Sequence, residues 1–230
     1  MTADPLAALF AELGRLRNLA VLEHELAARG FSRIAGVDEA GRGSLAGPVV
    51  AAAVVLPPGC VLPGLDDSKR LDAEERRSLD GKIRRHAVAF ALGVVNAAEI
   101  DARNILRASL EAMRQAVLAL RPEPDAVLVD AVRVPGVEPP QLAIVHGDAL
   151  SISIAAASIL AKVHRDALLD ALSRRHPAYG FDQHKGYGTP EHWAALRSSG
   201  PSPEHRLTYR GVVPEPGSAA IAGRAARRRG

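Results

Sequence analysis

The spacing of apolar residues predicts a helix at the start of the chain and two strands directly after it. From residue 5 to residue 29 leucines recur at helical spacing, and Gly30 is expected to end the helix. The leucines that form this stripe are Leu6, Leu9, Leu13, Leu16, Leu19, Leu22 and Leu26. Residues 31–38 and 49–56 are apolar runs of strand length, and their short connection favours an antiparallel pair.

The middle of the chain continues with a helix, a strand and a second helical region. Asp72 is expected to cap the first helix, since Glu75 follows three residues later as in a capping box. Residues 87–95 are rich in Val, Ala and Phe and predict a third strand. Residues 98–120 predict a helix that is broken near Asn104.

Two short strands and a long helix follow. Residues 126–129 form a buried run that ends at Asp130, and residues 142–146 form another that is followed by Gly147 and Asp148. The helix predicted over residues 151–172 carries small residues that allow close packing on a sheet. Strands that first follow one another and then alternate with helices indicate an α/β domain with a mixed sheet.

This pattern divides the chain into four parts. We expect a helical N-terminal extension at 1–30 and a main domain at 31–175. A segment at 176–212 combines a glycine-rich loop with a short helix, and 213–230 is expected to be a disordered basic tail. No internal repeat is found.

The amino-acid composition favours an ordinary globular protein. Apolar residues make up 47% and charged residues 24% of the 230 residues, as in ordinary globular proteins. The longest apolar stretch, residues 46–56, is too short to span a bilayer, and the N-terminus has no signal pattern, so we expect a cytoplasmic protein without membrane association. The lone Cys60 excludes an internal disulfide and a multi-cysteine zinc site.

The charge balance is weakly basic. The formal charge is +3, the pI is near 9.3, and arginine supplies nearly all of the positive charge. This surplus permits nucleic-acid binding without requiring it.

Acidic residues follow three of the predicted strands. Asp38 and Glu39, Asp130, and Asp148 stand at or just beyond strand ends, where ligands gather in open α/β sheets. Oxygen ligands without cysteine favour Mg²⁺ or Mn²⁺, and the eight histidines lack zinc-ligand spacing. Two such ions would suit phosphodiester hydrolysis.

Alternative interpretations of these acids remain. An Asp after a strand is more often a turn residue or helix cap, and Asp148 could simply cap the following helix. Asp66, Asp67 and Asp72 are interpreted as loop and cap residues. Because consecutive strand residues point to opposite faces, we expect the chain to kink there so that Asp38 and Glu39 share one site, and Glu39 has the longer reach.

Two glycine-rich segments carry further candidate chemistry. Residues 41–46 fit a dinucleotide-binding pattern, but a strand follows instead of the required helix, so we reject that interpretation. In the loop at 184–189, Lys185 could contact phosphate and Tyr187 could stack on a sugar or base, or the loop could be a plain surface turn.

In these motifs the chain resembles the bacterial ribonuclease HII family. The matching segments are Ala35 to Gly43, Leu45 to Val50, Asp67-Ser68-Lys69, Asn104-Ile105-Leu106, Gly147-Asp148, Ile154 to Val163, His184 to Thr189 and His205-Arg206. They occur in order over about residues 33 to 210. The first 30 residues are too few for the N-terminal domain of the related type III enzymes, which favours type II.

The resemblance implies an RNase H-like fold with a five-stranded mixed sheet and a helical C-terminal appendage. It implies cleavage of the RNA strand of RNA/DNA hybrids, and incision on the 5′ side of single ribonucleotides in duplex DNA during ribonucleotide excision repair. The family's acidic residues fall on Asp38, Glu39, Asp130 and Asp148. Its 2′-hydroxyl-sensing motif falls on Gly41, Arg42 and Gly43, and its sugar-packing tyrosine on Tyr187.

Four positions depart from the usual family pattern, and none is a predicted metal ligand. Ser44 stands where proline is common, Ala131 where glycine is common, and Leu150 where lysine is frequent. Tyr209 stands where phenylalanine is usual.

The sequence therefore predicts a monomeric metal-dependent endoribonuclease. Asp38, Glu39, Asp130 and Asp148 are expected to bind Mg²⁺ or Mn²⁺, two ions in the substrate complex, and hydrolysis to leave 3′-hydroxyl and 5′-phosphate ends. Candidate phosphate contacts are Lys69, Lys185 and Arg42. The alternatives are a non-catalytic hybrid-binding module and a nucleotide-cofactor enzyme on a Rossmann-like sheet.

Overall fold

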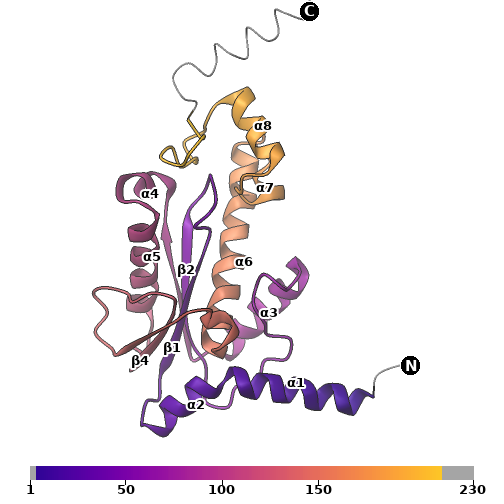
Figure 1. The fold of residues 1–230 in the computed structure, drawn as a ribbon, viewed down its shortest axis with the longest axis vertical. Coiled ribbons are helices and arrows are strands. Elements are labelled where there is room, and N and C mark those ends of the chain that lie inside the picture. Colours follow the sequence, from indigo (N-terminus) through magenta and orange to yellow (C-terminus); the bar gives the residue numbers. More distant parts are fainter. Residues whose placement is uncertain (1–3, 214–230) are drawn as a thin grey trace, which may run out of the picture.

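A five-stranded mixed sheet forms the centre of the molecule in the computed structural model, which describes residues 4–213 (Figure 1). The strands are β1 (Ile34–Ala40), β2 (Val49–Val55), β3 (Ala89–Val95), β4 (Ala126–Asp130) and β5 (Gln141–Ile144), in the order β3-β2-β1-β4-β5. β1 pairs antiparallel with β2 and parallel with β4. The expected α/β mixed sheet is confirmed, whereas the predicted tail lies outside the described residues.

Helices cover both faces of this sheet. Their bounds are α1 (Pro5–Leu19), α2 (Val21–Ala28), α3 (Ala73–His86), α4 (Ala97–Arg103), α5 (Ile105–Ala119), α6 (Ile152–Arg175), α7 (Phe181–His184) and α8 (Pro190–Ser199), with a 3₁₀ turn η1 (Gly147–Ala149) before α6. Asp72 and Glu75 form the expected capping box on α3. The predicted break near Asn104 is confirmed, since Asn104 ends α4 with φ 74° and its side chain caps α5.

Helix α5 packs on one face of the sheet, and α6 with α3 packs on the other (Figure 1). β2 shows the division: Val49, Ala51 and Ala53 face α5, while Val50 and Ala52 face α6. Every residue of β2 is buried because helices cover both sides. The central strands are therefore held from two directions, and only their ends reach solvent.

The closest approach between layers is that of α6 to β1. At Gly36 a Cβ would overlap backbone atoms of Ser153 and Ile154 in the first turn of α6. Glycine thus lets the helix backbone rest directly on the strand, two residues before Asp38. This contact sets where the start of α6 stands relative to the end of β1.

Helices α1 and α2 lie at one end of the sheet, and α7 and α8 lie toward the other (Figure 1). The helix predicted over 5–29 is two helices that meet at Ala20, and Leu16, Leu19 and Ala20 join the core beneath α6. Helices α7 and α8 pack at the far end of α6. No helix among residues 4–213 combines the length and apolar character needed to cross a bilayer.

Replacing Gly36 by Ala should lower the free energy of unfolding by about 3 kcal/mol, because neither the strand nor the helix backbone can move away cheaply. Urea denaturation monitored by circular dichroism measures this. Gly14→Ala is the matched control: Gly14 lies in α1 with open space around it, so alanine should stabilise by up to about 1 kcal/mol. Equal stability of G36A and wild type would contradict the close packing.

Candidate active site

Asp38 and Asp130 lie side by side at the ends of two parallel strands. The register pairs Val37 with Val129, so the next residues, Asp38 and Asp130, are cross-strand neighbours on the face that α6 covers. Asp38 is only 6% exposed. Its Oδ1 accepts the Glu39 amide at 2.7 Å, and the amide of Gly147 donates to Asp130 Oδ1 at 2.8 Å. The sheet thus brings together two carboxylates that are 92 positions apart in the sequence.

Glu39 lies on the opposite face, and the expected kink is absent. β1 stays in regular antiparallel register with β2 through Ala40, with Asp38 opposite Ala52 and Glu39 opposite Ala51. The prediction of a kink at this point was wrong because the Gly-Arg-Gly turn begins only after Ala40. The Glu39 carboxylate instead accepts Arg42 Nη1 at 3.2 Å.

Asp148 approaches the same edge from η1. It is 6% exposed, and Lys69 Nζ donates to its Oδ2 at 3.1 Å. The alternative that Asp148 merely caps the next helix is wrong, since Ser151 is the N-cap of α6 and its side chain accepts the amide of Ile154. Asp148 is therefore held by a lysine on a loop that precedes α3.

Burial and mutual repulsion dominate the electrostatics of these carboxylates. Burial, followed by the charges of Glu39 and Asp130, raises the pKa of Asp38 well above its usual range. Burial also raises the pKa of Glu39, and Asp130 adds to this, although Arg42 opposes it. Burial lowers the pKa of Lys69, but the hydrogen bond and charge of Asp148 outweigh it and the net shift is upward.

The donor set fits a hard divalent cation in its chemistry. All candidate ligands are carboxylate oxygens, and Asp38 is buried among like charges that a cation would neutralise. Among residues 4–213, however, no three His, Cys, Asp or Glu side chains form a ready-made metal cluster. The physical reason is that Lys69 holds Asp148, Arg42 holds Glu39 and the Gly147 amide holds Asp130.

The Gly-Arg-Gly segment forms an exposed turn directly after these acids. The amide of Ser44 donates to the Gly41 carbonyl at 3.4 Å, which places Arg42 and Gly43 at the tip. Gly41 has φ 97°, and a Cβ there would overlap the buried side chain of Arg165. As expected, β2 and not a helix follows the turn, which excludes the dinucleotide-binding interpretation.

The loop carrying Tyr187 is fixed against this turn. The amide of Leu45 donates to the Gly186 carbonyl at 2.8 Å. Tyr187 is 39% exposed, and Arg165 and Lys162 lie over its ring at 5.5 and 5.8 Å from the ring centroid. The ammonium of Lys185, expected to contact phosphate, is instead paired with Asp170.

Two buried arginines hold both loops, and sequence reasoning missed their role. Arg165 donates to the carbonyls of Pro48, Ala46 and Lys185 at 3.0–3.2 Å, and Arg206 donates to those of Gly47 and Arg42 at 2.9–3.1 Å. Both are 0% exposed, and neither makes an ion pair within the described residues. A signal existed for Arg165, which lies at four-residue spacing between the buried Ala161 and Leu169 of α6.

Two neutral histidines form a hydrogen-bonded pair that holds the Tyr187 loop through its backbone. His192 Nδ1 lies 2.9 Å from the Tyr187 carbonyl and must donate, so its Nε2 accepts from His205 Nε2 at 3.0 Å. His205 Nδ1 then accepts the Ser202 amide and hydroxyl at 2.9 and 2.8 Å. Both rings are buried, and this chain of donors fixes each tautomer.

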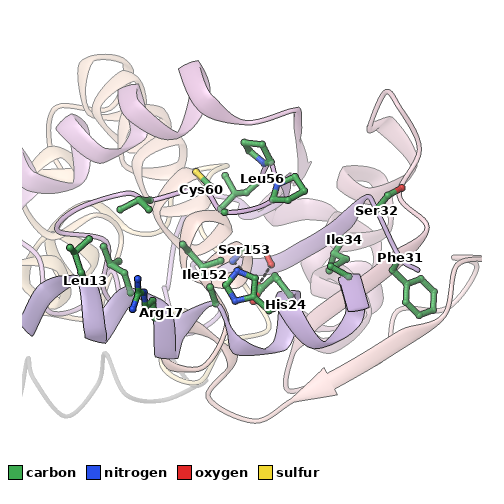
Figure 2. Close-up of a pocket in the computed structure, with 18 residues that line it drawn as sticks. Leu13, Arg17, His24, Phe31, Ser32, Ile34, Leu56, Cys60, Ile152 and Ser153 are labelled. Atoms are coloured by element: carbon green, nitrogen blue, oxygen red, sulfur yellow. Dashed lines mark hydrogen bonds between the residues drawn. The ribbon is translucent and has the colours of Figure 1, made fainter. Parts of the chain in front are cut away.

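A cavity lies away from the carboxylates, between the N-terminal helices and the sheet (Figure 2). It measures about 370 Å³, and mainly apolar side chains line it, including Leu13, Leu56 and Ile152. Glu23 Oε1 at its wall accepts the Ser151 hydroxyl and the Ser153 amide at the start of α6. The predicted site residues do not line this cavity.

Comparison with known proteins gives a consistent result. Residues 35–212 match the family model for Ribonuclease HII. The chain is 56% identical over 195 residues to Ribonuclease HII of Geobacillus kaustophilus, covering 85% of this chain and 75% of the relative.

Solved structures share the fold. The crystal structure of ribonuclease H2 from Pyrococcus horikoshii OT3 superposes with a TM-score of 0.67 at 26% identity, covering 85% of this chain and 99% of that one. Bst-RNase HIII in complex with Mn²⁺ gives a TM-score of 0.61 at 20% identity, covering 86% and 73%, and shows likeness of fold alone.

Stability should fall as the pH drops from about 6.5 to 4. Burial and the neighbouring His192 lower the pKa of His205 to about 4, whereas an unfolded histidine titrates near 6.5. Between these values the unfolded chain binds the extra proton, so acid favours unfolding by up to about 3 kcal/mol. Urea denaturation at pH 7 and pH 5 should show a smaller loss in H205Q than in wild type.

The exposed His24 gives the matched control for this experiment. His24→Gln should keep the wild-type dependence on pH. If H205Q and wild type lose the same stability on acidification, then the buried neutral histidine pair is not the cause.

Proposed function

The chain belongs to the ribonuclease HII family and is an RNase H endonuclease, and from this premise we propose its substrates and its catalytic groups. It incises on the 5′ side of single ribonucleotides in duplex DNA and cleaves the RNA strand of RNA/DNA hybrids. The products carry 3′-hydroxyl and 5′-phosphate ends. It acts on these duplexes as a monomer that depends on Mg²⁺ or Mn²⁺.

One observation carries this proposal: the neighbouring carboxylates of Asp38 and Asp130 stand beside an exposed glycine turn at the end of the same strand. The carboxylates can act on a phosphate, and exposed backbone amides can contact a ribose hydroxyl. Because Asp38 and Gly43 are five residues apart, the two functions stay at a fixed separation.

Asp38, Glu39, Asp130 and Asp148 would hold the divalent cation. Because β1 does not kink at Glu39, this longer side chain would have to reach the cation from the opposite face of the strand. When bound, the cation supplies charge neutralisation at the phosphate and lowers the pKa of water. Asp38 and Asp130 contribute from neighbouring strands. To bind the cation, Asp148 must give up its contact with Lys69, and Glu39 its contact with Arg42. Both cationic side chains are then released toward substrate phosphates.

The glycine turn and Tyr187 select the ribose. The 2′-hydroxyl is the group that distinguishes RNA from DNA at a given site, and glycines let the duplex backbone come close to protein amides. The exposed part of the Tyr187 ring packs against the following sugar. The ammonium of Lys185 is paired with Asp170, so Lys185 contacts phosphate only if its ammonium binds both groups at once.

Cleavage of three labelled duplexes tests this function directly. The duplexes are identical in sequence and contain one ribonucleotide, a full RNA strand or DNA only. With Mg²⁺ or Mn²⁺ we expect cuts in the first two, on the 5′ side of the single ribonucleotide, and none in the third. Cleavage of the DNA duplex, or binding of hybrids without any cut, would overturn the proposal in favour of another nuclease or a binding module.

Asp38→Asn should reduce cleavage by at least about a thousandfold while leaving the fold as stable as wild type or more so. The change removes a buried charge that Glu39 and Asp130 repel, and the amide oxygen still accepts the Glu39 amide. Single-turnover cleavage and urea denaturation measure the two effects. Asp66→Asn removes a loop carboxylate elsewhere and should keep wild-type rates.

A further inference from the structure

The carbonyl of Arg42 at the tip of the glycine turn has two donors. Arg206 Nη1 lies 2.9 Å from this oxygen, and the Tyr209 hydroxyl lies 2.6 Å from it. The same Arg206 nitrogen also donates to the Tyr209 hydroxyl at 3.0 Å. The Arg42–Gly43 peptide is therefore held on its carbonyl side by a compact group of two side chains.

This contact fixes the direction of the next amide. In a trans peptide the carbonyl and the following N–H point in opposite directions. The Arg42 carbonyl points inward to Arg206, so the N–H of Gly43 points outward. Gly43 is exposed, its amide has no partner among the described residues, and a Cβ there would meet no atom within 4 Å. The turn thus presents one free donor to a ligand.

The two side chains that hold the peptide are themselves anchored. Arg206 is 0% exposed, its Nε and Nη2 donate to the Gly47 carbonyl, and its guanidinium lies 5.2 Å from the Tyr209 ring centroid. Asp101 of α4 accepts the amides of Leu207 and Thr208 at 2.7 and 3.0 Å. Residues 206–209 therefore form a rigid support between α4 and the turn.

We propose that Arg206 and Tyr209 are positioning residues that aim the Gly43 amide at the substrate 2′-hydroxyl, and so set the preference for ribose over deoxyribose. The inference rests on the proposed function. The Tyr209 hydroxyl is the distinctive part, because it adds a second donor to a carbonyl that a phenylalanine would leave to Arg206 alone.

Tyr209→Phe tests the proposal because it removes only this hydroxyl. Affinities for a duplex with one ribonucleotide and for the all-DNA duplex are measured by fluorescence anisotropy in EDTA, so that no cleavage occurs. The ratio of the two affinities should fall about three- to tenfold in Y209F, the effect of one hydrogen bond. The catalytic efficiency on the single-ribonucleotide duplex in Mg²⁺ should fall by a similar factor.

Tyr179→Phe is the matched control. Its hydroxyl also donates to a backbone carbonyl, that of Gly200 at 2.8 Å, but away from the glycine turn. R206K, which keeps the charge and loses the planar fork, should lower the affinity ratio further than Y209F. Thermal melting records the stability of each variant.

The outcomes separate the inference from the function on which it rests. If wild type bound the single-ribonucleotide and all-DNA duplexes with nearly equal affinity, this would contradict ribose selection itself. A wild-type preference that Y209F retains in full, or that Y179F loses equally, would overturn the role of the Tyr209 hydroxyl while leaving the enzyme's function intact.

Discussion

The contact of α6 with β1 at Gly36 is the constraint on which the candidate site depends. Because the first turn of α6 rests on the strand backbone, every later residue of this straight helix has a fixed position relative to β1. Just before the helix, η1 carries Asp148. One turn beyond the contact, Ser158 lowers the pKa of Asp38 slightly against the effect of burial, and further along Arg165 lies beneath the glycine turn. One helix–strand contact thus places the acids and the loops together.

The two buried arginines differ from the acids in how the cost of their burial is compensated. Burying a charge without a counter-charge is unfavourable, and burial accordingly lowers the pKa of Arg165 to about 10 and lowers that of Arg206. Each guanidinium recovers hydrogen bonds from inward-pointing carbonyls of the turn and its neighbours. Since the Arg42 carbonyl points inward to Arg206, the amide of Gly43 points outward and is left free at the tip of the turn.

Sequence reasoning predicted the elements and the acidic residues better than their surroundings. Apolar runs of strand length located every strand of the sheet, whereas the proximity of Asp38 and Asp130 follows from the parallel pairing of β1 with β4, which the sequence did not show. The kink at Glu39 was wrong because alternation alone cannot show where a strand ends. Whether the acidic residues act as ligands stays a prediction. The supports formed by Arg165 and the histidine pair were not predicted, because hydrogen bonds to backbone carbonyls require tertiary structure. The spacing of Arg165 between apolar residues of α6 indicates its burial but not its partners.

The opposite charges at this edge of the sheet also explain how one small surface can bind a polyanion while carrying a cluster of acids. Asp38, Asp130 and Glu39 would repel a phosphate, but the fixed positive charges of Arg165 and Arg206 lie just below the adjoining turn and have no carboxylate partner among residues 4–213. Under the proposed function, a duplex that approaches the turn would meet the free amide of Gly43 over buried cations before its phosphate reaches the acids. In that proposal, binding and chemistry depend on different residues, so ribose selection would leave intact the repulsion among the acids that a cation would neutralise.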